Sequence, residues 1–546
     1  MNKNPISISN VQYPMSKIQG EALDRAGSTP RPTTEPTHRL FCSPGRRPGW
    51  LFLLAALLAV SAPAAEPQEQ PARELTLEEC VGLALENNLD LKIEKIARRE
   101  ARYDGNIARG GYDPNVEISA KRTSEETLGA ETESGRVRSE TDADDWSASV
   151  GGATALGGLS YEIGARLGDS SGVREGNPFD TSAASAGVTL TQPLLKGFKT
   201  GDTRYRVAVA DKQSAEALAQ LEGRLQEMLA QVETAWYALI QAREGVRVQE
   251  DAVRLATQLF EDNRRKVQIG AMSMLDEKQA ESQAATARAD LSSARRAYAE
   301  ACNQLKSLVF ADHRNFRELE LAAVGDLAAE PVATDPEASG VRALENRPDL
   351  RQARLALERQ GLVVNYQRNQ TLPSLDLVGG YGLAASSEDS YGSAVDRLES
   401  ADEPYWTAGV TLSFPLGNRA AKNRHAQSLA AAEKSGLQLR QLEETALVEV
   451  DNAISSVATG LERVQATKEA RTYAEQALAA EQRKFENGKS TSFVVLQLQR
   501  DLTGARKAEI EALADYNQQL SALALAEGSM LARHGVEFAD PAVKAP

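Results

Sequence analysis

The side chains best suited to acid–base, nucleophilic or metal chemistry are few in this 546-residue chain, and they are scattered along it. The histidines and cysteines are His38, His313, His425, His534, Cys42, Cys80 and Cys302. None of them has a metal-binding or thiol-redox spacing, and no nucleophile-elbow or phosphate-loop pattern occurs. The glycine-rich stretch 197–201 lacks the phosphate-loop spacing and instead predicts a turn from a strand into a helix. We therefore predict no catalytic residues, no metal and no cofactor, and a protein that is not an enzyme.

Composition and charge narrow the class of partner. Hydrophobic residues make up 42% of the chain and charged residues 25%, which is ordinary for a folded protein. The net charge is −15 and no basic stripe occurs, so we expect no nucleic-acid partner. Cys80 and Cys302 fall on predicted helices far apart in the sequence. An exported chain with so few cysteines is not a disulfide scaffold, and we expect both to be small apolar helix residues.

The N-terminal region predicts export. Arg46 and Arg47 precede an apolar run at 50–60, which is too short to span a membrane, and Ala62-Pro63-Ala64 follows as a small-residue cleavage site. Residues 1–65 are therefore interpreted as an N-terminal extension and signal peptide. The part before Arg46 is rich in Pro, Ser and Thr. Either the translation start has been placed too far upstream, or this part is a disordered extension.

An internal duplication organises the rest of the chain. Four blocks recur in the same order, and the pairs are 84–91 with 343–350, 186–194 with 408–416, 265–270 with 483–488, and Tyr298 with Tyr516. A fixed order of self-similar blocks is the signature of a repeated structural unit. We therefore divide the chain into a first repeat (66–309), a connecting segment (310–337), a second repeat (338–533) and a C-terminal tail (534–546).

Each repeat predicts the same elements in the same order: a helix, a strand hairpin, a very long helix and a return helix. The expected ranges of the helices and return strands are 76–111, 185–194, 200–267 and 274–309, then 338–369, 407–416, 418–486 and 492–532. In the return strands apolar and polar residues alternate, as at Val188, Thr189, Leu190 and Thr191. This alternation fits a barrel wall between lipid and water, and equally a half-buried sheet on a soluble core.

Strand number and loop length bear on how a barrel could close. Two hairpins supply four strands, whereas a water-filled barrel needs at least about eight, so several chains would have to pool their strands. The hairpin of the first repeat also carries a long insertion, at about 124–184. Residues 146–151 and 159–163 alternate within it like a further hairpin. We predict extended structure there, either in the barrel wall or as an external loop.

The long helices carry a sustained coiled-coil seam. Apolar residues step by three and four at Leu218, Leu221, Leu225, Met228, Val232, Ala235, Leu239, Ala242 and Val246, and again at Leu447, Val450, Ile454, Val457, Leu461 and Val464. A straight helix of about 68 residues would be about 100 Å long. Such helices suit the wall of an extended conduit. The alternative is a periplasmic or envelope coiled-coil protein with a structural or signalling role.

From Leu75 to about Leu531 the chain resembles the TolC-like outer-membrane efflux family. The resemblance rests on Leu75-Thr76-Leu77-Glu78-Glu79, Ala84-Leu85-Glu86-Asn87-Asn88, Gln192-Pro193-Leu194, the turn glycines and the duplication. It implies a mainly α protein with a membrane β-barrel portion, located in the outer membrane and extending into the periplasm. It further implies a homotrimer with a twelve-stranded barrel, to which each chain adds at least four strands, and a periplasmic tunnel. The partners it implies are outer-membrane lipid, a periplasmic adaptor, and an inner-membrane pump or ABC exporter.

The resemblance places the gate and the adaptor contact at the two helix-hairpin tips. The residues it points to are Gly270, Met274, Leu275, Asp276, Phe485, Gly488, Phe493, Val494 and Gln497. Asp276 keeps an acidic residue that is common in the family. Val494 and Gln497 stand where the best-known member has acidic residues, and Phe485 stands where it has a gating tyrosine. An apolar gate is therefore expected, and ordinary helix-hairpin packing is the alternative role for each residue.

Overall fold

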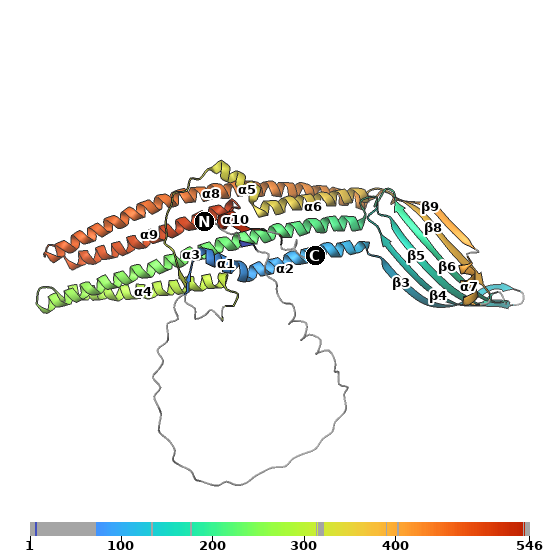
Figure 1. Ribbon diagram of the computed structural model, residues 1–546, viewed down its shortest axis with the longest axis horizontal. Coiled ribbons are helices and arrows are strands. Elements are labelled where there is room, and N and C mark those ends of the chain that lie inside the picture. The colour runs from blue at the N-terminus through green and yellow to red at the C-terminus, as the bar shows by residue number, and fades with distance from the viewer. Residues whose placement is uncertain are drawn as a thin grey trace, which may run out of the picture.

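The protein is an elongated bundle of helices with a β-sheet at one end, as the computed structural model shows (Figure 1). The structure describes residues 6–7 and 73–540, apart from 133–134, 175–176, 313, 315–320, 389, 401–402 and 539. Of the predicted N-terminal extension and signal peptide (1–65), Ile6 and Ser7 are described, whereas the rest, with His38 and Cys42, lies outside the described residues, as does His313. Two helical hairpins extend away from the sheet, and their turns form the opposite end of the molecule (Figure 1).

The helices follow the predicted duplication. The first copy has α1 (Leu77–Asn87), α2 (Leu89–Arg109), a 3-10 turn (Gly110–Tyr112), α3 (Asp202–Gln268) and α4 (Met274–Val309). The second copy has α5 (Pro336–Asn346), α6 (Pro348–Gln370), α7 (Tyr391–Glu399), α8 (Arg419–Glu486), α9 (Ser492–Ala526) and α10 (Met530–His534). The long helices, of 67 and 68 residues, confirm the predicted conduit-length helices. None of the helices in the described ranges has an apolar stretch long enough to cross a membrane.

Three predicted helices are wrong in that each is interrupted. The helix expected at 76–111 breaks at Asn88, whose side chain caps α2 by accepting a hydrogen bond from the Leu91 amide at 3.0 Å. The helix expected at 338–369 breaks before Pro348, because the residue preceding a proline is driven out of the helical region. The last helix ends at Ala526, and Gly528 follows with φ +71°. Helix α7, in the predicted polar loop of the second repeat, was not expected.

One antiparallel sheet contains six strands. In spatial order these are β3 (Asn115–Thr132), β4 (Gly135–Ala153), β5 (Ser160–Arg174), β6 (Asn177–Pro193), β8 (Ser374–Ser387) and β9 (Pro404–Ser413). Two short parallel pairs join β2 (Arg73–Leu75) to β7 (Leu321–Ala323) and β1 (Ile6–Ser7) to β10 (Val536–Glu537). The prediction of at least four strands is confirmed. The insertion at about 124–184 is extended as predicted, and it adds β4 and β5 to the sheet between β3 and β6.

The register of the sheet separates an apolar face from a polar face. One row of paired residues crosses all six strands and is wholly apolar or aromatic: Val116, Val150, Ile163, Val188, Tyr381 and Trp406. The adjacent row, on the opposite face, is Glu117, Ser149, Gly164, Gly187, Gly382 and Tyr405. The side chain of Trp406 is 75% exposed in the single chain, so no other part of the described chain covers this end of the apolar row. The predicted alternation is confirmed.

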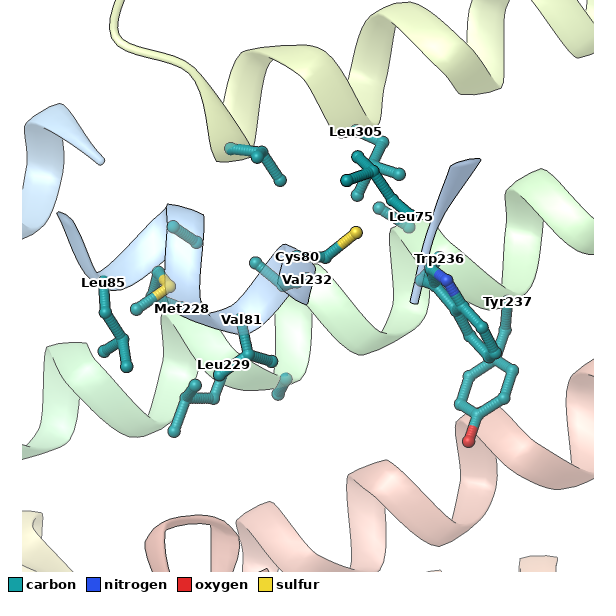
Figure 2. Packing of buried hydrophobic residues seen from close by; sticks show 14 of the residues in the cluster. Leu75, Cys80, Val81, Leu85, Met228, Leu229, Val232, Trp236, Tyr237 and Leu305 are labelled. Carbon is teal, nitrogen blue, oxygen red and sulfur yellow. The ribbon is translucent and has the colours of Figure 1, made fainter. Parts of the chain in front are cut away.

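The main hydrophobic core lies at the middle of the bundle, where α1 and the small β2–β7 pair pack on α3 and on the end of α4. Figure 2 shows Val81 and Leu85 of α1 beside Met228 and Leu229 of α3. Cys80 and Cys302 are buried here as reduced thiols, as predicted for apolar helix residues. The core therefore fixes the middle of the molecule, while both hairpins extend beyond it toward their tips (Figure 1).

Candidate functional site: the paired helix-hairpin tips

The two hairpin turns have the same backbone structure. In each, a glycine with positive φ lies two residues after the last helical residue: Gly270 (φ +74°) ends α3 and Gly488 (φ +69°) ends α8. The turn hydrogen bonds are Gly270 N to Val267 O (2.9 Å), Ala271 N to Lys266 O (2.8 Å), Gly488 N to Phe485 O (3.1 Å) and Lys489 N to Lys484 O (2.8 Å). This pattern is the Schellman motif, which satisfies the last carbonyls of a helix and favours glycine at the left-handed position. The turn glycines thus set where α3 and α8 end.

Asp276 connects the first tip to the second. It lies in the first turn of α4, where the Ser273 hydroxyl donates to its Oδ2 at 2.7 Å and accepts from its amide at 3.3 Å. Its Oδ1 accepts a hydrogen bond from the hydroxyl of Ser492, the first residue of α9, at 3.0 Å. The hydrogen bond from Ser273 holds the pKa of Asp276 below its usual value; partial burial opposes this, and Ser492 contributes further lowering. An ionised carboxylate therefore holds the two hairpins together.

A second contact between the tips involves Phe485. The Lys266 ammonium of α3 lies 4.1 Å from the centroid of the Phe485 ring of α8, within the range of a cation–π interaction. The ring also packs against a small buried cluster that contains Leu259 of α3 together with Leu478 and Val495. Phe485 is therefore part of the packing between the two hairpins.

The remaining predicted tip residues divide by exposure. Met274 (69% exposed), Leu275 (66%) and Phe493 (52%) are large apolar side chains left open to solvent in the single chain. Val494 and Gln497 are also exposed, on α9. The three lie in the first turns of α4 and α9, and contiguous exposed apolar side chains are a feature of contact surfaces. The tip thus has an internal set of contacts, around Asp276 and Phe485, and an outward apolar set.

Sequence reasoning missed three tip residues that the structure brings into contact with the predicted ones: Lys266, Ser273 and Ser492. Ser273 had a sequence signal, because a serine three residues before an acidic residue at a helix start is a capping pattern. Ser492 and Lys266 had none, since their partners lie 216 and 219 residues away in the sequence.

Nearer the middle of the bundle, an ion-pair network also joins the hairpins. The Arg506 guanidinium of α9 lies 3.5 Å from Asp251 of α3 and 3.0 Å from Glu475 of α8. Arg471 pairs with the same glutamate at 3.3 Å. The hydrogen bond from Arg506 lowers the pKa of Glu475, partial burial opposes this, and the charges of Arg471 and Arg506 add to the lowering. Arg506 is thus a further link between the two hairpins.

These features define a class of protein: a duplicated conduit subunit with tunnel-length helices, paired tips and a sheet that has one apolar face. A profile of the outer membrane efflux protein family matches residues 80–309 and 340–529, and the chain belongs to that family. It is therefore an outer-membrane channel subunit that acts as the exit duct of tripartite efflux, and not an enzyme. This finding replaces the alternative of a structural or signalling coiled-coil protein.

Individual relatives agree with this assignment. The chain is 24% identical to the outer membrane efflux protein BepC of Brucella suis over 364 residues, covering 64% of this chain and 73% of the relative. It is 22% identical to the outer membrane protein TolC of Vibrio cholerae, covering 65% and 78%, and 26% identical to the cobalt-zinc-cadmium resistance protein CzcC of Cupriavidus metallidurans, covering 56% and 69%.

Solved structures share the fold. The outer-membrane channel OprN superimposes with a TM-score of 0.63 at 17% identity, covering 83% of this chain and 90% of that one. The CmeC channel of Campylobacter jejuni gives a TM-score of 0.62 at 16% identity, covering 83% and 85%. The open state of the MtrE channel of Neisseria gonorrhoeae gives 0.59 at 17% identity, covering 83% and 89%.

Proposed function

We propose that three copies of this chain form one duct, and that the helical tunnel docks on a periplasmic adaptor and an inner-membrane pump or ABC exporter. In this proposal residues 66–309 and 338–533 are the two repeats, each providing strands to the wall and a hairpin to the tunnel. The exposed apolar side chains of Met274, Leu275 and Phe493 support a partner at the tips, because such a patch is stabilised when another surface covers it.

In this proposal the entrance of the duct opens when the two hairpins separate at their tips. The observation that carries it is the hydrogen bond from Ser492 Oγ to Asp276 Oδ1, at 3.0 Å, because it spans the two repeats at the end of the molecule. The Lys266–Phe485 contact and the Arg506–Asp251 pair join the same two hairpins. Moving one hairpin outward breaks all three contacts, while the core at the middle of the bundle stays packed.

The test is the conductance of the purified protein in planar lipid bilayers. Asp276→Ala removes the acceptor for Ser492, and a hydrogen bond to a charged group contributes about 1.5–3 kcal/mol, so open events should become about tenfold or more frequent. Glu281→Ala is the matched control, because Glu281 is an acidic residue on the same helix whose ion-pair partner, Lys278, is also on α4. Equal opening in wild type and Asp276→Ala would contradict tip gating, and so would equal increases in the two variants.

A further inference from the structure

The number of strands that each chain contributes determines the width of the barrel. What we infer from that number rests on the proposed trimer. A twelve-stranded barrel requires four strands from each of three chains. Here a single continuous sheet contains six strands, and each neighbouring pair is antiparallel over 10 to 16 residue pairs. The additional strands β4 and β5 lie between β3 and β6, so they are not an appendage at an edge of the sheet.

The sheet ends in two open edges. Among the strands of the described residues, β3 and β9 each have a strand neighbour on one side only. All ten residues of β9 are exposed in the single chain. Edge strands that remain solvent-exposed are normally protected by charges, prolines or bulges on their flanks. The two edge strands do carry such features, namely Lys121 and Arg122, a register irregularity after Leu128, and Pro404. The apolar row nevertheless runs to both edges, where Val116 on β3 (63% exposed) and Trp406 on β9 (75% exposed) remain uncovered in the single chain.

The occupant that fits these edges is a second copy of this chain. Because the six strands are antiparallel throughout and even in number, β3 and β9 run in opposite directions. Copies related by rotation about the barrel axis therefore bring β9 of one copy antiparallel to β3 of the next. That pairing satisfies the backbone donors and acceptors of both edges, and it keeps the apolar side chains on one face of the wall.

We propose that β9 pairs with β3 of the neighbouring copy, and that the trimeric barrel has eighteen strands, with β4 and β5 of each copy in its wall. With strands about 4.8 Å apart and tilted by about 40°, the backbone radius is about 18 Å for eighteen strands and about 12 Å for twelve. The barrel is then about 1.5 times as wide as one built from four strands per chain.

The strand count is measured by electron cryomicroscopy of the wild-type protein in lipid nanodiscs. Eighteen strands in a trimer support the inference. Twelve strands in a trimer, with β4 and β5 outside the wall, would overturn the inference and leave the proposed function intact. A protein that does not form trimers would overturn both. Deletion of residues 135–174 removes β4 and β5 and leaves β3 antiparallel to β6, so the variant should form trimers whose barrel radius is smaller by about one third.

The edge pairing has its own test in intact outer membranes. A cysteine at Ser119, on the polar face of β3, is combined in turn with a cysteine at Thr407, Gly409 or Thr411 on the polar face of β9. Oxidation should link copies covalently for at least one of these pairs, because paired residues on one face bring their Cβ atoms within disulfide range. The control pairs Ser119 with Val410, whose side chain lies on the opposite face. No links in any of the three pairs, or equal links in the control, would overturn the proposed edge pairing.

Discussion

The turn glycine of the second tip allows a quantitative prediction. Gly488 has φ +69°, and apart from Gly488 itself and its two chain neighbours no atom of the described residues lies within 4 Å of the Cβ that an alanine would add. The cost of Gly488→Ala is therefore a backbone cost alone, of about 1–2 kcal/mol for an L-residue in the left-handed region. If the closed turn loses that stability, the equilibrium constant for local opening rises by about 5- to 30-fold.

The assay is amide hydrogen exchange of the purified trimer, followed by mass spectrometry over peptides that contain residues 484–491. Exchange of the Gly488 and Lys489 amides, which donate to Phe485 and Lys484, should accelerate by the same factor. Gly504→Ala, in the interior of α9, is the control. There the same change should stabilise the helix, by about 0.5–1 kcal/mol. If both variants exchanged like wild type at the tip, the reasoning from backbone strain would be refuted.

Three further outcomes follow from the contacts described above. Arg506→Ala should increase bilayer conductance by up to about fivefold, because a partly exposed ion pair contributes up to about 1 kcal/mol. The increase should be smaller at high salt. Arg463→Ala, which breaks an ion pair within one hairpin, should leave the conductance unchanged. Because the folded pKa of Asp276 is depressed, its link should persist above about pH 4 and be lost as pH falls through that pKa. Conductance should then rise, and Asp276→Asn should reduce this rise, the remainder coming from carboxylates such as Glu475 that pair with Arg506. Leu229→Ala should destabilise the fully buried core by about 2–5 kcal/mol, measured as a lower unfolding temperature by circular dichroism.

Much of the architecture could be predicted because its signals are local. The apolar steps along the long helices recur every three or four residues, so α4 was predicted with its observed ends, Met274 and Val309, and α3 and α8 to within two residues at either end. The break at Asn88 also had a local signal, an asparagine able to cap a helix, but the continuing apolar pattern concealed it. The short helix α7 had no strong signal, since its nine residues lie in a Gly- and Ser-rich stretch.

The tip residues show the limit of local reasoning. Gly270 and Gly488 were identifiable because a glycine after a long helical pattern marks a helix end. The partners of Asp276 and Phe485 were not, because each contact joins residues that are close only after two separate hairpins pack side by side. No spacing rule within one repeat encodes that packing.

The sequence by itself therefore determined the duplication, the long helices, the turn glycines and the two-faced strands, since each is a repeat or a periodicity along the chain. Tertiary structure alone decided that the insertion adds β4 and β5 to the sheet between β3 and β6, because alternation is the same in a strand of the main sheet and in a separate hairpin. It also decided which residues hold the tips together. Strand pairing and helix packing bring together backbone and side-chain groups far apart in sequence, and their energies depend on contacts that no local pattern records.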